Sequence, residues 1–107
     1  IGRAEAFLGT LLSFKPILTV KDGETIPVAR ERTRGRAIEH LRRFATGFTN
    51  IKEMAVIYTT TPEEAATLTQ SLDMVFPVER IYAATIGSVM GTHLGPGALG
   101  VALLEGE

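Results

Sequence analysis

The alternation of helical and extended patterns over only 107 residues constrains the fold more than any other feature of this sequence. Apolar residues recur at helical spacing in three segments, over residues 3–13, 33–46 and 61–73. Short apolar runs of strand character occupy residues 54–58, 78–84 and 98–104. This alternation predicts an α/β fold in which helices pack on a mixed β-sheet. At this length we expect a single domain with one hydrophobic core.

Residues with special backbone preferences mark the ends of these elements. The proline of Lys15-Pro16 ends the first helix, because it disfavours a helical conformation in the residue before it. Asp22-Gly23 lies between two short apolar runs and predicts a β-hairpin over residues 17–28. Gly47 stands in the C-cap position of the second helix, and Thr61-Pro62 supplies the third with an N-cap and a first-turn proline.

Composition and charge argue against several classes of function. The net charge of −1 and the pI near 6.2 give no overall basic field that would attract nucleic acid. Without cysteine the chain has no disulfide, no thiolate nucleophile and no cysteine-ligated zinc, which is compatible with a reducing cytosol. No apolar run reaches the roughly 18 to 20 residues that span a bilayer, and the start has no signal-peptide pattern. We therefore expect a soluble, cytoplasmic protein.

Glycine is concentrated in the segment from Ile86 to Gly100. A phosphate-binding loop needs a strand before it and a helix after it, so that helix amides face the anion. Here the loop leads into a predicted strand, and neither a Gly-Lys-Ser/Thr ending nor a complete Gly-x-Gly-x-x-Gly pattern is present. A nucleotide site is therefore disfavoured. What remains is a backbone that can approach a ligand closely, with Ser88, Thr92 and His93 as its polar side chains.

Four stretches of the chain together resemble one known family, the DegV family, and in particular its C-terminal domain. They are Gly2-Arg3 with Leu8-Gly9-Thr10-Leu11-Leu12, Lys15-Pro16-Ile17-Leu18, Asp22-Gly23-Glu24 ahead of the helix start at 34–37, and Ile86-Gly87 through Gly91-Thr92-His93 to Gly95-Pro96-Gly97-Ala98-Leu99-Gly100-Val101. The Gly-Thr-His and Gly-Pro-Gly-Ala sequences are the most specific part of the match. DegV-family proteins are the fatty-acid-binding subunits of bacterial fatty acid kinase systems.

The resemblance implies a two-domain protein of which residues 1–107 form the C-terminal fatty-acid-binding domain. Ile1 leads directly into a helix-like pattern without an initiating methionine, so we expect that upstream chain, including the first domain, has been removed. In such a family the carboxylate of the ligand lies near the domain boundary and is contacted mainly by serine and threonine of the first domain. His93 completes that site from this chain, with Thr92 and Gly91 beside it.

The same resemblance implies that the acyl chain is buried in this domain. The candidate lining residues are apolar side chains of one face, namely Leu8, Leu11, Leu12, Ile17 and Ile86. Taken singly, each of them is an ordinary core residue, and only their shared face makes them candidates. The implied ligand is a long-chain fatty acid, with no cofactor and no metal.

The resemblance further implies a role without catalysis by this chain. The catalytic subunit of the kinase transfers phosphate from ATP to the bound acid, so this protein presents the substrate. Arg32, Arg34 and Arg36 cluster at the start of a helix, where positive charge opposes the helix dipole. A charge without local benefit indicates docking of the partner, although such a run is more commonly a solvated face. Transient contact with a membrane surface is left open.

Two other functions stay open from the residues alone. One is a small-molecule-binding regulatory domain. The other is a hydrolase that combines Ser88 and His93 with a carboxylate, but the chain has no Gly-x-Ser-x-Gly nucleophile elbow. His93 considered alone is more often a loop residue that satisfies local hydrogen bonds, and His40 on a charged helix is expected to be a solvated residue without function.

Overall fold

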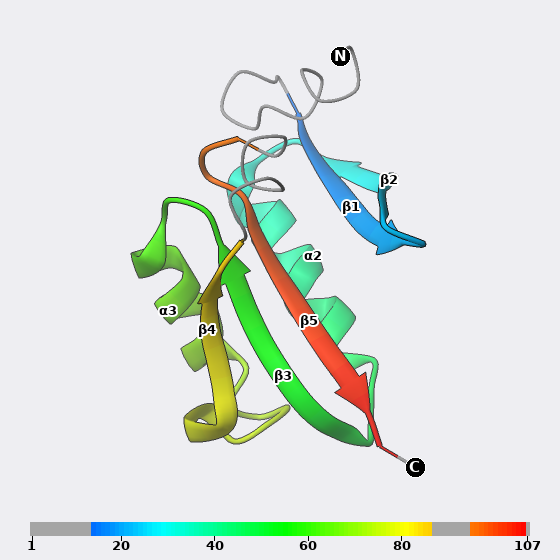
Figure 1. The fold of residues 1–107 in the computed structure, drawn as a ribbon. Coiled ribbons are helices and arrows are strands. Elements are labelled where there is room, and N and C mark those ends of the chain that lie inside the picture. Colours follow the sequence, from blue (N-terminus) through cyan, green and yellow to red (C-terminus); the bar gives the residue numbers. More distant parts are fainter. Residues whose placement is uncertain (1–13, 87–94, 107) are drawn as a thin grey trace.

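The computed structural model describes residues 14–86 and 95–106 and has an α/β fold (Figure 1). A two-stranded sheet consists of β1 (Lys15–Lys21) and β2 (Glu24–Glu31). A three-stranded sheet has the spatial order β4 (Ile81–Thr85), β3 (Ile51–Tyr58) and β5 (Leu99–Glu105). The described helices are α2 (Arg34–Thr46), α3 (Pro62–Ser71) and a 3₁₀ turn at Val78–Arg80. The helix predicted over 3–13 lies outside the described residues.

The predicted β-hairpin is confirmed. β1 and β2 pair antiparallel, and the turn between them places Asp22 at φ 52° and Gly23 at φ 79°. Two successive positive φ values are what a tight hairpin turn requires, and Asp-Gly tolerates them. The register shifts between Ile17 and Leu18, so the hairpin contains one irregularity near its base.

The larger sheet is mixed, as the sequence predicts. β3 runs parallel to β4, with α3 between them along the chain, and antiparallel to β5. Within the described residues the hairpin pairs only with itself and forms a second sheet beside the mixed one. Two-residue turns favour such local pairing.

The strand predicted over residues 78–84 needs correction at its start. Residues Val78–Arg80 form a 3₁₀ turn that is closed by a hydrogen bond from Arg80 N to Pro77 O at 2.9 Å. The strand begins only at Ile81, which pairs with Met54. The apolar pattern of this segment does not distinguish the turn from the strand that follows it.

Both described helices begin at the predicted residues, but only one has its predicted side-chain cap. The Thr33 side chain accepts a hydrogen bond from Arg36 N at 3.2 Å, as an N-cap should. Thr61 stands at the N-cap position of α3 without a side-chain capping hydrogen bond, and Pro62 opens that helix as predicted. Gly47 is the C-cap of α2 and donates to Phe44 O at 3.2 Å, but its φ of −76° is right-handed. The left-handed conformation that glycine favours at helix ends is therefore not used here.

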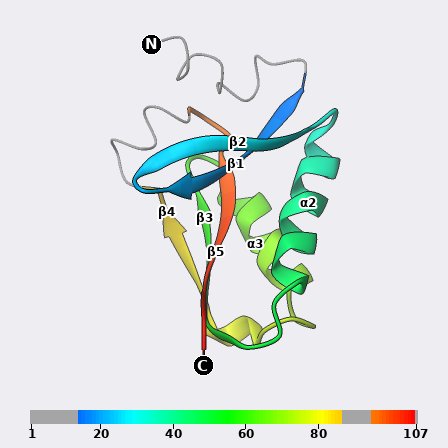
Figure 2. The same cartoon turned by 90° about the vertical axis from the view of Figure 1, so that its right-hand side faces the viewer.

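The core lies between the three-stranded sheet and the two helices. Figure 2 shows α2 and α3 together on one side of the sheet. The buried cluster consists of Ala45, Met54, Val56, Ala65, Leu68, Leu72 and Phe76. Met54 and Val56 of the central strand thus point toward the helices, and their neighbours Leu103 and Val101 on β5 pack against the same cluster.

The opposite side of this sheet carries no helix of the described chain (Figure 2). Because successive strand residues point to opposite faces, it bears the residues that alternate with the core positions. Glu53 and Leu104 pair at one end of this side. The rest of it is apolar, and we call this part the helix-free face; it comprises Ala55 and Ile57 on β3, Tyr82 and Ala84 on β4, and Gly100 and Ala102 on β5. Tyr82 is 62% exposed, and Ala84 and Ala102 are exposed as well.

Candidate functional site

Both flanks of the glycine-rich segment are anchored at the carboxyl end of β3. Ile86 N donates to Tyr58 O at 2.9 Å, and Thr59 N donates to Ala98 O at 3.1 Å. β3 and β4 are parallel and end at the same edge of the sheet, and β5 begins there (Figure 1). Open α/β sheets bind ligands outside the carboxyl ends of their strands. We therefore take this edge as the candidate functional site.

The turn from Gly95 to Ala98 is held by two threonines that follow β3. Thr59 Oγ1 donates to Gly95 O and accepts from Ala98 N, both at 3.0 Å. Gly97 N donates to Thr60 Oγ1 at 2.8 Å. Gly95 and Gly97 have φ values of 79° and 80°, which glycine adopts without the steric penalty that other residues incur. This turn is therefore fixed both by its own glycines and by its hydrogen bonds to Thr59 and Thr60.

Arg34 joins the same turn to both helices. From the first position of α2, its Nε donates to Glu64 Oε2 at 2.7 Å, and its Nη2 donates to the second carboxylate oxygen and to Gly97 O, the latter at 2.7 Å. Glu64 lies in the first turn of α3, where a negative charge is favourable. The fork of a guanidinium group suits this two-oxygen contact. Arg34, Glu64 and Gly97 are called the Arg34 clamp below.

The Arg34 clamp also changes the ionisation of its members. The hydrogen bond from Arg34 lowers the pKa of the Glu64 carboxyl below its usual value, while partial burial acts in the opposite direction. The same hydrogen bond raises the pKa of Arg34. Because the folded-state pKa of Glu64 is depressed, its contribution to stability is present at neutral pH and is lost as the pH falls through that pKa.

The premise that the arginines at the start of α2 lack a local function is wrong for Arg34. Its charge is compensated by Glu64, a residue 30 positions away. The other two differ, because the guanidinium groups of Arg32 and Arg36 form no ion pair with any residue in 14–86 or 95–106, and both residues are exposed. Docking by Arg32 and Arg36 therefore stays a prediction, and Arg34 has a structural partner.

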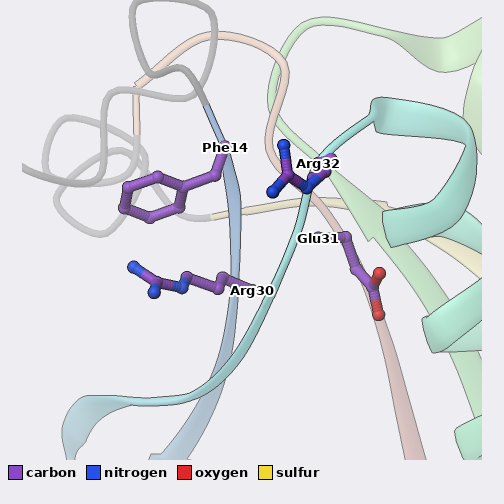
Figure 3. Close-up of a pocket in the computed structure, with 4 residues that line it drawn as sticks. All are labelled: Phe14, Arg30, Glu31 and Arg32. Carbon is purple, nitrogen blue, oxygen red and sulfur yellow. The ribbon is translucent and has the colours of Figure 1, made fainter.

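A hollow of about 380 Å³ lies near the base of the hairpin (Figure 3). It is lined by Phe14, Arg30, Glu31 and Arg32. The Arg30 guanidinium lies 5.1 Å from the centroid of the Phe14 ring, a cation–π contact. Two guanidinium groups and a carboxylate do not suit an acyl tail, so this hollow is not a candidate for the acyl pocket.

His40 is less isolated than its sequence context predicts. Its Nδ1 lies 3.1 Å from Glu31 Oε2, and the two side chains are only partly exposed. The contact joins α2 to β2. His40 is thus a bridge within the fold rather than a purely solvated residue.

The predicted acyl-pocket residues are only partly described. Ile17 is 7% exposed and lies on β1 of the hairpin, outside the main core cluster. Ile86 is half-buried directly after β4, at the candidate edge. Leu8, Leu11 and Leu12 lie outside the described residues, as do Gly91, Thr92 and His93. The carboxylate and tail roles of all eight residues therefore stay predictions.

The fold and this edge define a mixed-sheet α/β domain with a glycine-rich segment anchored at the carboxyl end of its central strand. Comparison with known families matches residues 1–106 to the DegV family, described there as uncharacterised. The chain belongs to the DegV family. Protein DegV of Bacillus subtilis is 36% identical over 104 residues, which are 94% of this chain and 37% of that protein.

Solved structures of the same family have this fold. A DegV family protein of Streptococcus agalactiae, described as fatty acid binding, matches with a TM-score of 0.77 and 25% identity, covering 92% of this chain and 36% of that one. A DegV family protein of Thermus thermophilus, whose structure is described by its fatty acid binding, matches with a TM-score of 0.67 and 36% identity, covering 94% and 38%. The chain thus spans little more than a third of these relatives.

Within residues 14–86 and 95–106, no group of three or more histidine, aspartate or glutamate side chains could hold a metal ion. No helix within residues 14–86 and 95–106 is long and apolar enough to cross a membrane.

Proposed function

We propose that this chain is the C-terminal domain of a two-domain fatty-acid carrier and that the acyl tail lies on the helix-free face. The observation that carries the proposal is that this apolar face adjoins the edge where the glycine-rich segment is anchored. Relatives described as fatty-acid-binding support the class of ligand. An uncovered apolar sheet face in a protein of this size marks a binding surface.

The energy of burying a long acyl chain is the main source of affinity in this proposal. On β3 the helix-free face contains Ala55 and Ile57, which are about 7 Å apart, so it would hold one part of an extended acyl chain that is on the order of 20 Å long. At roughly 0.8 kcal/mol per buried CH₂, about fifteen methylenes gain on the order of 12 kcal/mol before the cost of association is subtracted. Most of the affinity therefore comes from the tail.

The middle of the helix-free face is closely packed. A Cβ at Gly100 would lie 3.1 Å from Cγ1 of Ile57 on the neighbouring strand, so the Ile57 side chain lies beside this glycine, and Ala102 stands opposite Ala55. The larger Tyr82 lies on the outer strand β4. Ile17 of the hairpin and Ile86 of the candidate edge are proposed to contact the tail near its carboxylate end.

The carboxylate is proposed to lie at the candidate edge, held by His93 and Thr92, with the Gly91 backbone close to it. An ionised carboxylate at a dry boundary is costly unless it accepts hydrogen bonds. A histidine ring N–H and a threonine hydroxyl can each donate one. The serine and threonine donors of the first domain complete this site in the proposed two-domain protein.

The chain is proposed to present the acid rather than transform it, as the relatives described as fatty-acid-binding support. A kinase subunit would transfer phosphate from ATP to the carboxylate exposed at the candidate edge. Arg32 and Arg36 are proposed as the docking contacts for that subunit, because exposed arginines suit an acidic or phosphorylated partner. Arg34 was predicted to dock as well, but the proposal rests on Arg32 and Arg36 because the Arg34 guanidinium already contacts Glu64.

The ligand class is tested by native mass spectrometry of the full-length protein after gentle purification. We expect an added mass that gas chromatography of the extracted lipid assigns to a long-chain fatty acid, bound at one molecule per protein. Repeated absence of any bound acid, together with no binding of added acid by calorimetry, would contradict the carrier function.

The docking role is tested by reversing two charges, Arg32→Glu with Arg36→Glu, in the full-length protein. We expect phosphorylation of the bound acid to fall several-fold at subsaturating carrier, because like charges replace the attraction, while the affinity for fatty acid stays unchanged. The matched control reverses two other exposed charges, Lys21→Glu with Lys52→Glu, and should keep normal turnover. Equal turnover of both double variants would remove the docking assignment.

A further inference from the structure

The Arg34 clamp lies at the point where four parts of the fold meet. α2 begins with Arg34 and α3 carries Glu64 in its first turn. Gly97 lies in the turn that leads into β5, and that turn is fastened to Thr59 at the end of β3. One guanidinium group thus bonds to two other segments, 30 and 63 positions away in the sequence.

The clamp contains one more hydrogen bond than is needed to connect the two helices. The ion pair with Glu64 alone would connect α2 to α3. The additional bond from Arg34 Nη2 to Gly97 O, at 2.7 Å, reaches a backbone carbonyl of the glycine-rich turn. Gly97 N donates to Thr60 Oγ1, so both backbone polar groups of Gly97 are bonded to side chains from distant segments. The turn is consequently fixed from two sides.

We propose that Arg34 and Glu64 are positioning residues for ligand recognition, because they fix the turn Gly95–Ala98 and with it the point at which the glycine-rich segment returns to the sheet. This inference rests on the proposed function. Donors that are held in place before the ligand arrives contribute more affinity, because less ordering is needed on binding. The clamp restrains Gly97, at the described end of the glycine-rich segment, without touching the ligand.

A comparable ion pair elsewhere on α2 provides a matched control. Arg42 bonds to Glu39 through two nitrogens at 2.9 and 2.6 Å, and this pair lies within one helix. The side chains of Arg34 and Glu64 are 34% and 35% exposed, and those of Arg42 and Glu39 are 37% and 41% exposed. Removing either arginine therefore deletes one positive charge and one contact in which two guanidinium nitrogens bond to a carboxylate, and the side chains involved are similarly exposed. The difference is that only Arg34 also contacts the turn.

The test compares Arg34→Gln with Arg42→Gln in the full-length protein, by measuring the affinities for a fatty acid and for its methyl ester. We expect the acid-over-ester preference to fall about fivefold in Arg34→Gln and to stay at the wild-type value in Arg42→Gln. The affinity for the ester should change little in either variant, because the tail contacts are the same. Arg34→Lys should fall between wild type and Arg34→Gln, since one ammonium group cannot reproduce the fork to Glu64 and the bond to Gly97.

The exchange variant Arg34→Glu with Glu64→Arg separates positioning from stability. It restores an ion pair between α2 and α3, but a carboxylate at position 34 cannot donate to Gly97 O. We expect the melting temperature to recover relative to Arg34→Glu alone, while the acid-over-ester preference stays low. Recovery of both quantities, or an unchanged preference in Arg34→Gln, would overturn the positioning role. If wild-type protein binds neither compound, the proposed carrier function fails instead.

Discussion

Replacing Ala102 with glutamate is expected to weaken fatty-acid binding by about 100-fold or more. Ala102 is exposed in the described structure and lies opposite Ala55, so the new side chain meets no packed core. A tail that covers this position would bury an unpaired carboxylate at a cost of several kcal/mol, and about 1.4 kcal/mol corresponds to a factor of ten. The measurement is calorimetric titration of delipidated full-length protein at pH 7, where an exposed glutamate is ionised.

The control for this experiment is the same substitution on the solvent side of α3. Ala66 is exposed there, and the helix lies on the opposite side of the sheet from the helix-free face (Figure 2). Ala66→Glu should bind fatty acid as the wild type does. If Ala102→Glu unfolds at the wild-type temperature and also binds with unchanged affinity, the tail lies elsewhere in the protein.

The elements that the sequence predicted well are those with a local chemical signature. Asp22-Gly23 encodes a turn through the backbone preferences of two adjacent residues, and Thr33 caps α2 by accepting a hydrogen bond from the backbone of Arg36, three residues downstream. The start of β4 was missed by three residues, because the apolar residues around Val78 fit a strand and a 3₁₀ turn equally well. Whether the hairpin joins the main sheet depends on long-range packing, which a local pattern does not contain.

The Arg34 clamp could not be predicted from sequence for the same reason. From the sequence alone, a positive charge at the start of a helix is expected to be unfavourable, because it opposes the helix dipole. The compensating carboxylate of Glu64 belongs to the first turn of another helix, where its sequence signal is simply that of a favourable helix start. Only the packing of α2 beside α3 brings the two together. A docking role predicted for an arginine is therefore better supported when the folded structure leaves that arginine without an ion pair.

The helix-free face could not be predicted from the sequence either. The apolar character of residues 99–104 predicts a buried strand, and the sequence pattern cannot tell which neighbours bury it. The register shows that Val101 and Leu103 meet the helices, whereas Gly100 and Ala102 share the opposite face with Ala55 and Ile57. β5 is apolar on both sides, but the described helices cover only one of them. For this reason we place the acyl tail on the other side.

Replacing His93 with alanine is the most direct test of the carboxylate site. The substitution removes one hydrogen-bond donor and leaves the proposed tail contacts intact, so binding should weaken without vanishing. A hydrogen bond to a charged group contributes about 1.5 to 3 kcal/mol, which corresponds to about a 10- to 150-fold loss of affinity for the acid. The same substitution should hardly affect the methyl ester, whose head group carries no charge. The two affinities are measured by calorimetry on the full-length protein.

The comparison of acid with ester is what separates a ligand contact from a structural role of His93. A histidine that only supports its own loop would, when removed, lower both affinities by the same factor, and the acid-over-ester preference would match the wild type. His40→Ala provides the control, because His40 contacts Glu31 between α2 and β2 and is not part of the proposed carboxylate site. A selective loss of acid binding in His93→Ala, absent from His40→Ala, would assign the imidazole to the carboxylate site rather than to general support of the domain, because no uniform loosening of the domain distinguishes a charged head group from a neutral one.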